Sequence, residues 1–177
     1  MINDEKIITL ITNDKVRLEI DIISADKSKL LKDLLQEYPN ETVVEIQEVD
    51  SKTVKKIIDY LIHFRTSDPT VILKPLVSSI LKEVTDEWSA NFIESFTIDE
   101  LYLIIEGAGY FQVESLLELA CCRVATIFKS KQDNIEELRT IFNIEADMTE
   151  EDRKKIEDEY REKRLKPYED KVKEGLI

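Results

Sequence analysis

Only a few side chains in this sequence have the types that catalysis or metal binding needs. The chain has one histidine, His63, and two adjacent cysteines, Cys121 and Cys122. A histidine can serve as a general base or a metal ligand near neutral pH, but His63 ends an amphipathic helical pattern, which indicates a partly exposed helix-end side chain. Adjacent residues of a helix point about 100° apart, so the two thiols do not converge on one metal ion as a CxxC pair can. Small side chains packed in or beside a core are the simpler interpretation of both cysteines.

Other catalytic motifs are missing from the sequence. The phosphate-binding patterns GxGxxG and GxxxxGK[ST] do not occur. The Asp and Glu residues, 38 in number, are spread along helical patterns, which is typical of solvated helix faces. We therefore predict no enzyme, no metal and no cofactor, and a protein that works by binding other proteins. An enzyme from a different class is kept only as a formal alternative, and an activity that depends on His63 would reveal it.

Composition limits the partners and the compartment. The chain has 177 residues, 42% of them hydrophobic, and a net charge of −13. This is enough apolar material for the core of one domain, or of one domain with an extension. A strongly negative charge repels nucleic acid and anionic membranes, and neither a bilayer-spanning run nor a signal peptide is evident. Two adjacent cysteines cannot build a disulfide framework, so we expect the cytosol and the nucleus.

Periodicity predicts an α/β beginning. Apolar residues alternate with polar ones over residues 6–21, with Asn13-Asp14 between the two runs, and this pattern indicates a β-hairpin. The next expected elements are a helix over residues 27–38, a short strand over 42–46 and an amphipathic helix over 50–64 that Ser51 or Asp50 caps.

Residues 65–88 do not give a single interpretation. Pro69 and Pro75 break the regular patterns, but apolar residues recur at helical spacing from Leu76 to Val84. We predict a short helix over residues 76–84 that docks on its own domain, on a partner or on a second copy. An ordinary long loop is the alternative.

The rest of the chain is helical. Thr97 and Glu100 form a capping-box pattern at the start of one helix, and Gly107 and Gly109 are expected to end it. Further helices are expected over residues 113–130, 134–142 and 149–160. Strands first and helices afterwards indicate an α+β fold.

Three stretches together resemble the S-phase-kinase-associated adaptor family. They are "IITLITNDKVRLEID" at residues 7–21, "LYLIIEGAGYFQVESLLELACCRVATIF" at 101–128 and "NIEELRTIFNIEADMTEED" at 134–152. The family's helix followed by Phe-Asn-Ile and an acidic Thr-Glu-Glu segment makes the combination specific. The resemblance covers about residues 6–160.

The resemblance implies an α+β domain of BTB/POZ type over residues 1–128, with a divergent insertion at about 66–87. C-terminal helices over residues 129–162 are expected to form a groove for an F-box protein, and residues 163–177 a flexible tail. The function implied is that of a non-catalytic adaptor, which links an F-box substrate receptor to a cullin in an SCF-type ubiquitin ligase.

The resemblance also implies which residues bind each partner. The cullin-binding candidates are Gly109 and Tyr110. The F-box-binding candidates are apolar positions and one amide on the later helices: Leu117, Cys121, Val124, Phe128, Phe142, Asn143, Ile144, Ile156 and Tyr160.

This chain departs from the family pattern at three places. The family's Asn-Tyr pair is Gly109-Tyr110 here, and the family's acidic loop is replaced by the apolar "VILKPLVSSIL" of residues 71–81. Glu162 stands where the family has a tryptophan near its C-terminus. Three alternatives therefore stay open: an F-box-binding subunit that acts without cullin, an elongin-C-like adaptor, and a homodimer in the absence of partners.

Overall fold

The structure, a computed structural model, describes residues 6–145 and 149–166. The chain divides into two compact units, the first ending at Asn134 and the second beginning at Ile135. Most of the predicted tail, residues 167–177, lies outside the described residues.

A three-stranded sheet opens the first unit. Its strands are β1 (Ile7–Ile11), β2 (Arg17–Asp21) and β3 (Val43–Glu45), in the spatial order β2-β1-β3. β1 pairs antiparallel with β2 and parallel with β3. Ile8, Leu10 and Ile20 turn toward the core and are buried, as expected from residues that alternate along a strand with one covered face. The predicted hairpin and third strand are confirmed.

The described helices of the first unit are α1 (Ile22–Ala25), α2 (Lys29–Glu37), α3 (Ser51–His63), α4 (Glu87–Glu94), α5 (Ile98–Tyr110) and α6 (Glu114–Ser130), with a 3₁₀ turn η1 (Leu81–Glu83) before α4. Among them, α2, α3, α5 and α6 follow the predicted patterns over most of their length, whereas α1 and α4 were not predicted. Asp50 is the cap of α3, because its carboxylate accepts a hydrogen bond from the backbone N–H of Thr53 at 2.9 Å. The capping box of Thr97 and Glu100 is present at α5.

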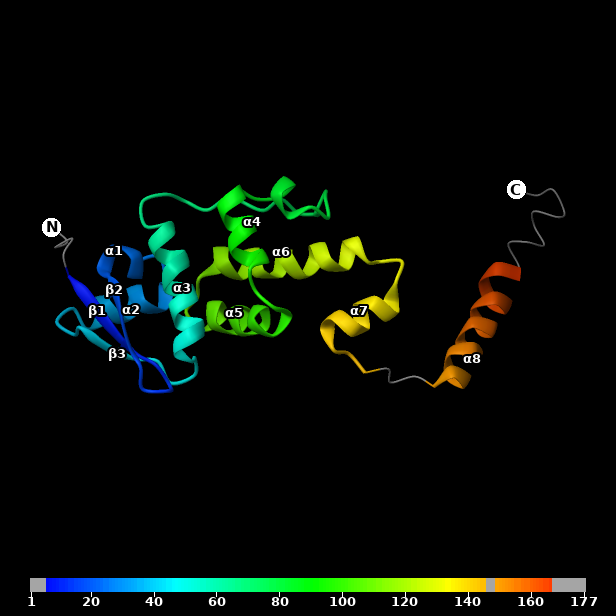
Figure 1. Ribbon diagram of the computed structural model, residues 1–177, viewed down its shortest axis with the longest axis horizontal. Coiled ribbons are helices and arrows are strands. Elements are labelled where there is room, and N and C mark those ends of the chain that lie inside the picture. The colour runs from blue at the N-terminus through cyan, green and yellow to red at the C-terminus, as the bar shows by residue number, and fades with distance from the viewer. Residues whose placement is uncertain (1–5, 146–148, 167–177) are drawn as a thin grey trace. The chain divides into compact units, whose positions relative to one another are not determined.

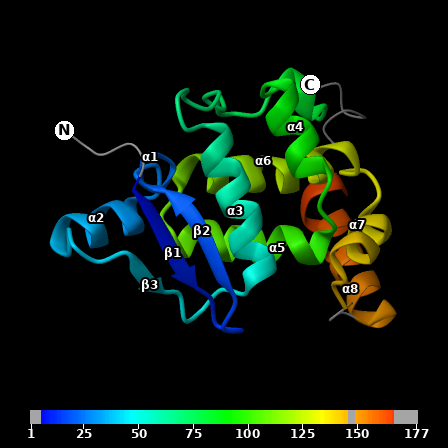
Figure 2. The same cartoon turned by 60° about the vertical axis from the view of Figure 1, so that its left-hand side comes forward.

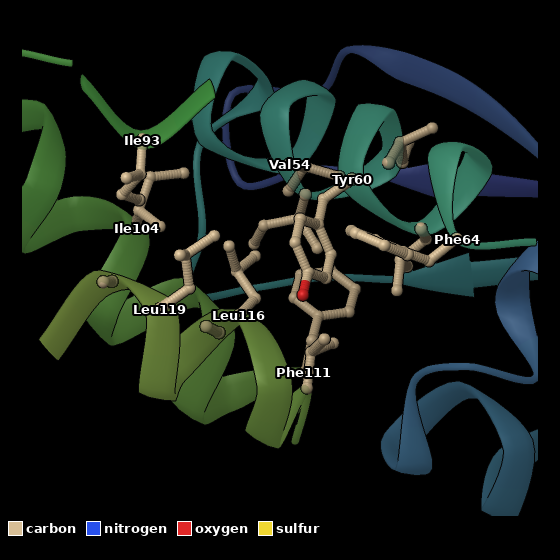
Figure 3. Close-up of a cluster of buried hydrophobic side chains, with 14 of the residues drawn as sticks. Val54, Tyr60, Phe64, Ile93, Ile104, Phe111, Leu116 and Leu119 are labelled. Carbon is tan, nitrogen blue, oxygen red and sulfur yellow. The ribbon is translucent and has the colours of Figure 1, made fainter. Parts of the chain in front are cut away.

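The core of the first unit lies around α3, which packs on β2 and on α5, while α5 packs on α6 (Figure 1). Figure 3 shows side chains of these helices filling one cluster, with Tyr60 of α3 directed toward Phe111 and Leu116. Burial raises the pKa of Tyr60 to about 12. At the surface of this cluster the exposed ring of His63 stacks on Trp88 at a centroid distance of 3.5 Å.

The expected end of α5 is wrong. Gly107 and Gly109 both lie inside the helix, which continues to Tyr110. The chain leaves the helix through Gln112, whose φ of 52° is left-handed, while the N–H of Val113 bonds to the carbonyl of Ala108 at 2.9 Å. This is a Schellman ending, which favours glycine but here uses glutamine.

Gly107 instead allows two helices to pack closely. A Cβ atom at this position would lie 2.8 Å from Cδ1 of Ile57 and 3.0 Å from Cγ2 of Thr53. The missing side chain therefore lets α5 approach α3 closely.

The predicted helix over residues 76–84 is also wrong. Residues 66–80, which we name the strap, run without regular structure along the top of the first unit in Figure 1 and Figure 2. Only Leu81–Glu83 form a helical turn. Pro75 lacks a backbone N–H and restricts Lys74 before it. Helical spacing alone therefore does not produce a helix in this stretch.

The second unit contains α7 (Ile135–Phe142) and α8 (Glu150–Tyr160), and a π-helical turn η2 (Arg161–Leu165) continues α8. A capping box of Thr149 and Asp152 opens α8. Arg153 of α8 lies 3.3 Å from the carboxylate of Glu136 in α7.

The described part of the chain contains neither a membrane-spanning helix nor a cluster of metal-binding side chains. Among its helices, none combines the length and the apolar character that crossing a membrane requires. Within residues 6–145 and 149–166, no cluster of three or more His, Cys, Asp or Glu side chains is suited to holding a metal ion.

Candidate protein-interaction surfaces

The C-terminal end of α5 carries the two cullin-binding candidates. Gly109 is exposed, and Tyr110 is half-buried with its ring 5.5 Å from that of Phe111. The fully buried Ser28 donates its hydroxyl to the carbonyl of Phe111 at 2.6 Å. This hydrogen bond ties the end of α5 to the start of α2 and fixes the position of Tyr110.

Gly109 differs from its neighbour Gly107 in its surroundings. A Cβ atom added at Gly109 would meet no atom within 4 Å, whereas one at Gly107 would collide with Ile57. Since the helix there has an ordinary right-handed backbone, the Cβ atom of an asparagine at position 109 would meet open space.

The four F-box candidates of α6 share one face of that helix. Leu117, Cys121, Val124 and Phe128 recur at spacings of four, three and four, which places them in one row. Leu117 and Val124 are half-buried, and Cys121 and Phe128 are exposed. The opposite face of α6 is buried in the core. The row is thus available at the surface of the first unit.

A groove lies between this row and the strap. Its volume is about 340 Å³, and its lining is mostly apolar. The lining residues come from two segments, Ile72, Lys74 and Leu76 of the strap and Leu117, Glu118, Cys121, Cys122 and Ala125 of α6. The strap residues were not among the predicted site residues.

Polar contacts hold the strap against α6. The ammonium group of Lys74 donates to the Glu118 carboxylate at 2.8 Å, and that of Lys129 donates to the carbonyl of Leu76 at 2.7 Å. The hydrogen bond to Glu118 raises the pKa of Lys74. In addition to these lysine contacts, Ile72 of the strap is buried. The strap is therefore anchored by packing as well as by charge.

Both cysteines line the groove, but they differ in exposure. Cys121 is exposed and Cys122 is buried, and burial raises the pKa of the Cys122 thiol. A thiol of raised pKa forms less thiolate at neutral pH and reacts more slowly. Cys121 is therefore the accessible thiol of the pair.

The Phe-Asn-Ile candidates end α7. Phe142 is buried, and Ile144 is 52% exposed. Asn143 has a left-handed φ of 51°, and the N–H of Ile144 bonds to the carbonyl of Arg139 at 2.9 Å. Asparagine is the residue after glycine that best tolerates this backbone. The motif therefore forms a Schellman ending that turns Ile144 outward.

The last two candidates lie one turn apart on α8. Ile156 and Tyr160 are 54% and 53% exposed. None of the α8 side chains that the structure describes is buried. Glu162, in the η2 turn, is exposed.

Comparison with known proteins places these features in a family. The family model described as "Skp1 family, tetramerisation domain" matches residues 6–66, and the one described as "Skp1 family, dimerisation domain" matches residues 114–163. The S-phase kinase-associated protein 1 homolog of Tetrahymena thermophila is 34% identical over 152 residues, which cover 86% of this chain and 90% of the relative. The chain belongs to the Skp1 family.

A second group of Skp1-family relatives is fungal. The E3 ubiquitin ligase complex SCF subunit sconC of Talaromyces stipitatus is 32% identical over 162 residues, 89% of this chain and 98% of the relative. The subunit of the same name from Arthroderma otae is also 32% identical over 162 residues.

These findings confirm the predicted family and the α+β fold of BTB/POZ type followed by helices. Because the Skp1 family consists of non-catalytic subunits, the prediction that the chain is not an enzyme is also confirmed. The match over residues 114–163 opposes the elongin-C-like alternative, which lacks the Phe-Asn-Ile helix and the segment C-terminal to it.

Proposed function

We propose that this protein is an SCF-type ubiquitin ligase adaptor that bridges an F-box substrate receptor and a cullin. Its contribution is positional, because an adaptor that holds a receptor near the transfer machinery raises the effective concentration of the substrate. Membership in the Skp1 family and relatives named as SCF subunits support this function. We place the protein in the cytosol and the nucleus.

One observation carries the F-box half of the proposal. Ile144, Ile156 and Tyr160 expose large apolar side chains on a unit whose last helix is otherwise charged. A helix with a narrow apolar seam and no buried side chain gains little by packing within its own chain. A partner that covers the seam would supply the missing apolar contact.

The cullin half rests on Tyr110. Its half-buried side chain packs against the core and lies next to the exposed Gly109. An F-box-binding subunit without cullin is the second candidate function, and the observation that favours it is the absence of the family's amide at position 109.

Pull-down of purified cullin and of F-box proteins by the whole chain tests the F-box half first. We expect Ile156→Asp and Tyr160→Asp to weaken F-box binding strongly, because each places a charge in an apolar contact. Ile62→Asp, at a 48% exposed position of α3, is the matched control and should bind normally. Unchanged F-box binding by both α8 variants would show that this seam does not bind the F-box receptor.

The cullin half needs its own pair of variants. Tyr110→Lys should weaken cullin binding and leave F-box binding intact. Gly109→Asn, which fits the open space there, should strengthen cullin binding. Loss of neither interaction in Tyr110→Lys would favour the subunit that acts without cullin, and equal loss of both would indicate misfolding.

A further inference from the structure

We infer that the strap is a second contact surface for the F-box receptor, which inserts a large apolar side chain into the groove between the strap and α6. This inference rests on the proposed function, since it names the same partner. It adds residues 71–80 to the interface, a segment in which this chain departs from its family's acidic loop.

The exposed side of the strap is unusually apolar. Val71 and Val77 are each 77% exposed, Leu73 is 72% exposed, and Ile80 is 56% exposed. Ile72 and the half-buried Leu76 of the strap, and Leu81 directly after it, pack into the first unit. The strap thus divides its apolar residues between an anchoring side and an outer side. Solvent-facing apolar clusters of this kind mark interaction sites more often than scattered single residues do.

The strap is held in place before any partner arrives. Lys74 is paired with Glu118, Lys129 holds the carbonyl of Leu76, and the hydroxyl of Thr70 donates to the Asp86 carboxylate at 3.1 Å. A segment fixed in this way loses little conformational freedom when a partner binds. The four outer side chains are therefore presented on a prepared surface.

The groove is continuous with the α6 row, and this identifies the molecule that would occupy it. Leu117 and Cys121 belong both to the predicted F-box-binding row and to the wall of this groove. Eight residues line the groove, whereas an independent stable interface has about 20–30 residues on each partner. The groove suits a partner that the neighbouring residues of α6 already hold, and that partner is the F-box receptor.

Charge argues against a second copy of this chain. Each copy carries a net charge of −13, so two copies repel each other. The strap itself has one acidic residue, Asp68, and one basic residue, Lys74, and is neutral. A neutral apolar surface discriminates little against a receptor segment of either charge.

The test compares three exposed Val→Ser substitutions. Val71→Ser and Val77→Ser are combined in one variant, and Val16→Ser, at a 40% exposed position beside the hairpin, is the matched control. The probe is a purified F-box receptor that the wild-type chain binds in the pull-down experiment. We expect the double variant to bind about tenfold more weakly, because two buried methyl-bearing side chains are lost. The control should bind like the wild type.

A second readout uses the thiols. Bound receptor should slow iodoacetamide alkylation of Cys121 in the wild type and slow it less in the double variant, while the buried Cys122 reports that the chain stays folded. Fluorescence of Trp88, the single tryptophan, provides an independent check of folding.

The outcomes separate the two proposals. If the wild type and the double variant bind the receptor equally, the strap contact is wrong and the adaptor function stands. If the wild type binds no F-box receptor, both proposals are wrong. If sedimentation shows a wild-type dimer that the double variant loses while receptor binding is unchanged, the groove holds a second copy and the inference is overturned.

Discussion

The two units of this protein differ in how much of their own apolar surface they cover. In the first unit, buried residues from the sheet and from α3, α5 and α6 form one continuous core. In the second unit, Leu138 and Phe142 are the buried hydrophobic residues among those described, and α8 contributes none. Burial of apolar surface is the main favourable term in folding. The first unit therefore has what an independent fold needs, whereas the second unit is suited to completion by a partner.

Similar residues therefore have different roles in the two units. An isoleucine in the first unit is a stability determinant, and an isoleucine on α8 is a binding determinant. Four sets of variants test that distinction, beginning with the largest expected effect.

Ile57→Ala should lower the free energy of unfolding by about 2–5 kcal/mol, because it opens a cavity in the core of the first unit. Ile57 is fully buried on α3. Ile156→Ala on α8 should change stability by less than about 0.5 kcal/mol, as surface substitutions usually do. Urea unfolding followed by Trp88 fluorescence measures both. A similar large loss in the two variants would mean that α8 belongs to the same cooperative core.

Gly107→Ala and Gly109→Ala should change the free energy of unfolding in opposite directions. The methyl group at position 107 would lie 2.8 Å from Ile57, and overpacking of this kind costs about 1–3 kcal/mol. The same change at position 109 meets open space and should stabilise the helix by about 0.5–1 kcal/mol. Thermal unfolding of the two variants checks this. If both were destabilising, the space beside Gly109 would be smaller than the structure indicates.

Asn143 offers a test within the second unit. Asn143→Ala should weaken F-box binding about fivefold, because a left-handed backbone costs an L-residue about 1–2 kcal/mol and alanine lacks the short polar side chain that lets asparagine tolerate it. Asn143→Gly should bind nearly as well as the wild type, since glycine adopts this backbone freely. Calorimetric titration with an F-box receptor gives both affinities. Equal weakening by glycine and alanine would instead assign a direct contact to the amide.

The smallest expected effect concerns acid stability at the cap of α4. Burial raises the pKa of Asp86, but hydrogen bonds from Ser89 and Thr70 outweigh it and hold the pKa below its ordinary value of 3.8. A carboxyl group whose pKa is lowered in the folded state stabilises the protein at pH values above the pKa that the group has in the unfolded state. This contribution is lost as the pH falls below about 3.8.

We therefore expect Asp86→Asn, which can still cap the helix, to flatten the fall in stability below this pH by up to about 1 kcal/mol. Unfolding by urea at several acid pH values, followed by Trp88 fluorescence, measures the slope. An unchanged slope would place the acid sensitivity at other carboxylates.

Local patterns predicted most of the fold. Alternation along residues 7–21 and helical spacing along α3 and α6 depend on neighbours in sequence, and these elements are as expected. The end of α5 could not be predicted in this way. Gly107 is a glycine because Ile57 of another helix lies against it, and nothing near residue 107 in the sequence carries that information.

The same limit applies to the candidate surfaces. The row on α6 was predicted from the family resemblance, because its spacing alone favours a core position, and the structure places it on one partly exposed face. The groove beside it could not be predicted, because Ile72 and Leu76 reach α6 from a distant part of the chain. Residues 76–84 were predicted as a helix because their apolar residues recur at helical spacing, but Leu76, Leu81 and Val84 pack on the core from a segment that is helical only over Leu81–Glu83.

The mixed pairing of the sheet has a consequence for the order of folding. β1 and β2 are joined by a short turn, and a hairpin of this kind forms on a timescale of about 1–10 μs. β3 pairs parallel with β1 only after the chain has passed through β2, α1 and α2, so its loop is longer and closes at a greater entropic cost. We therefore expect the hairpin to form first and the pairing of β3 with β1 to follow it.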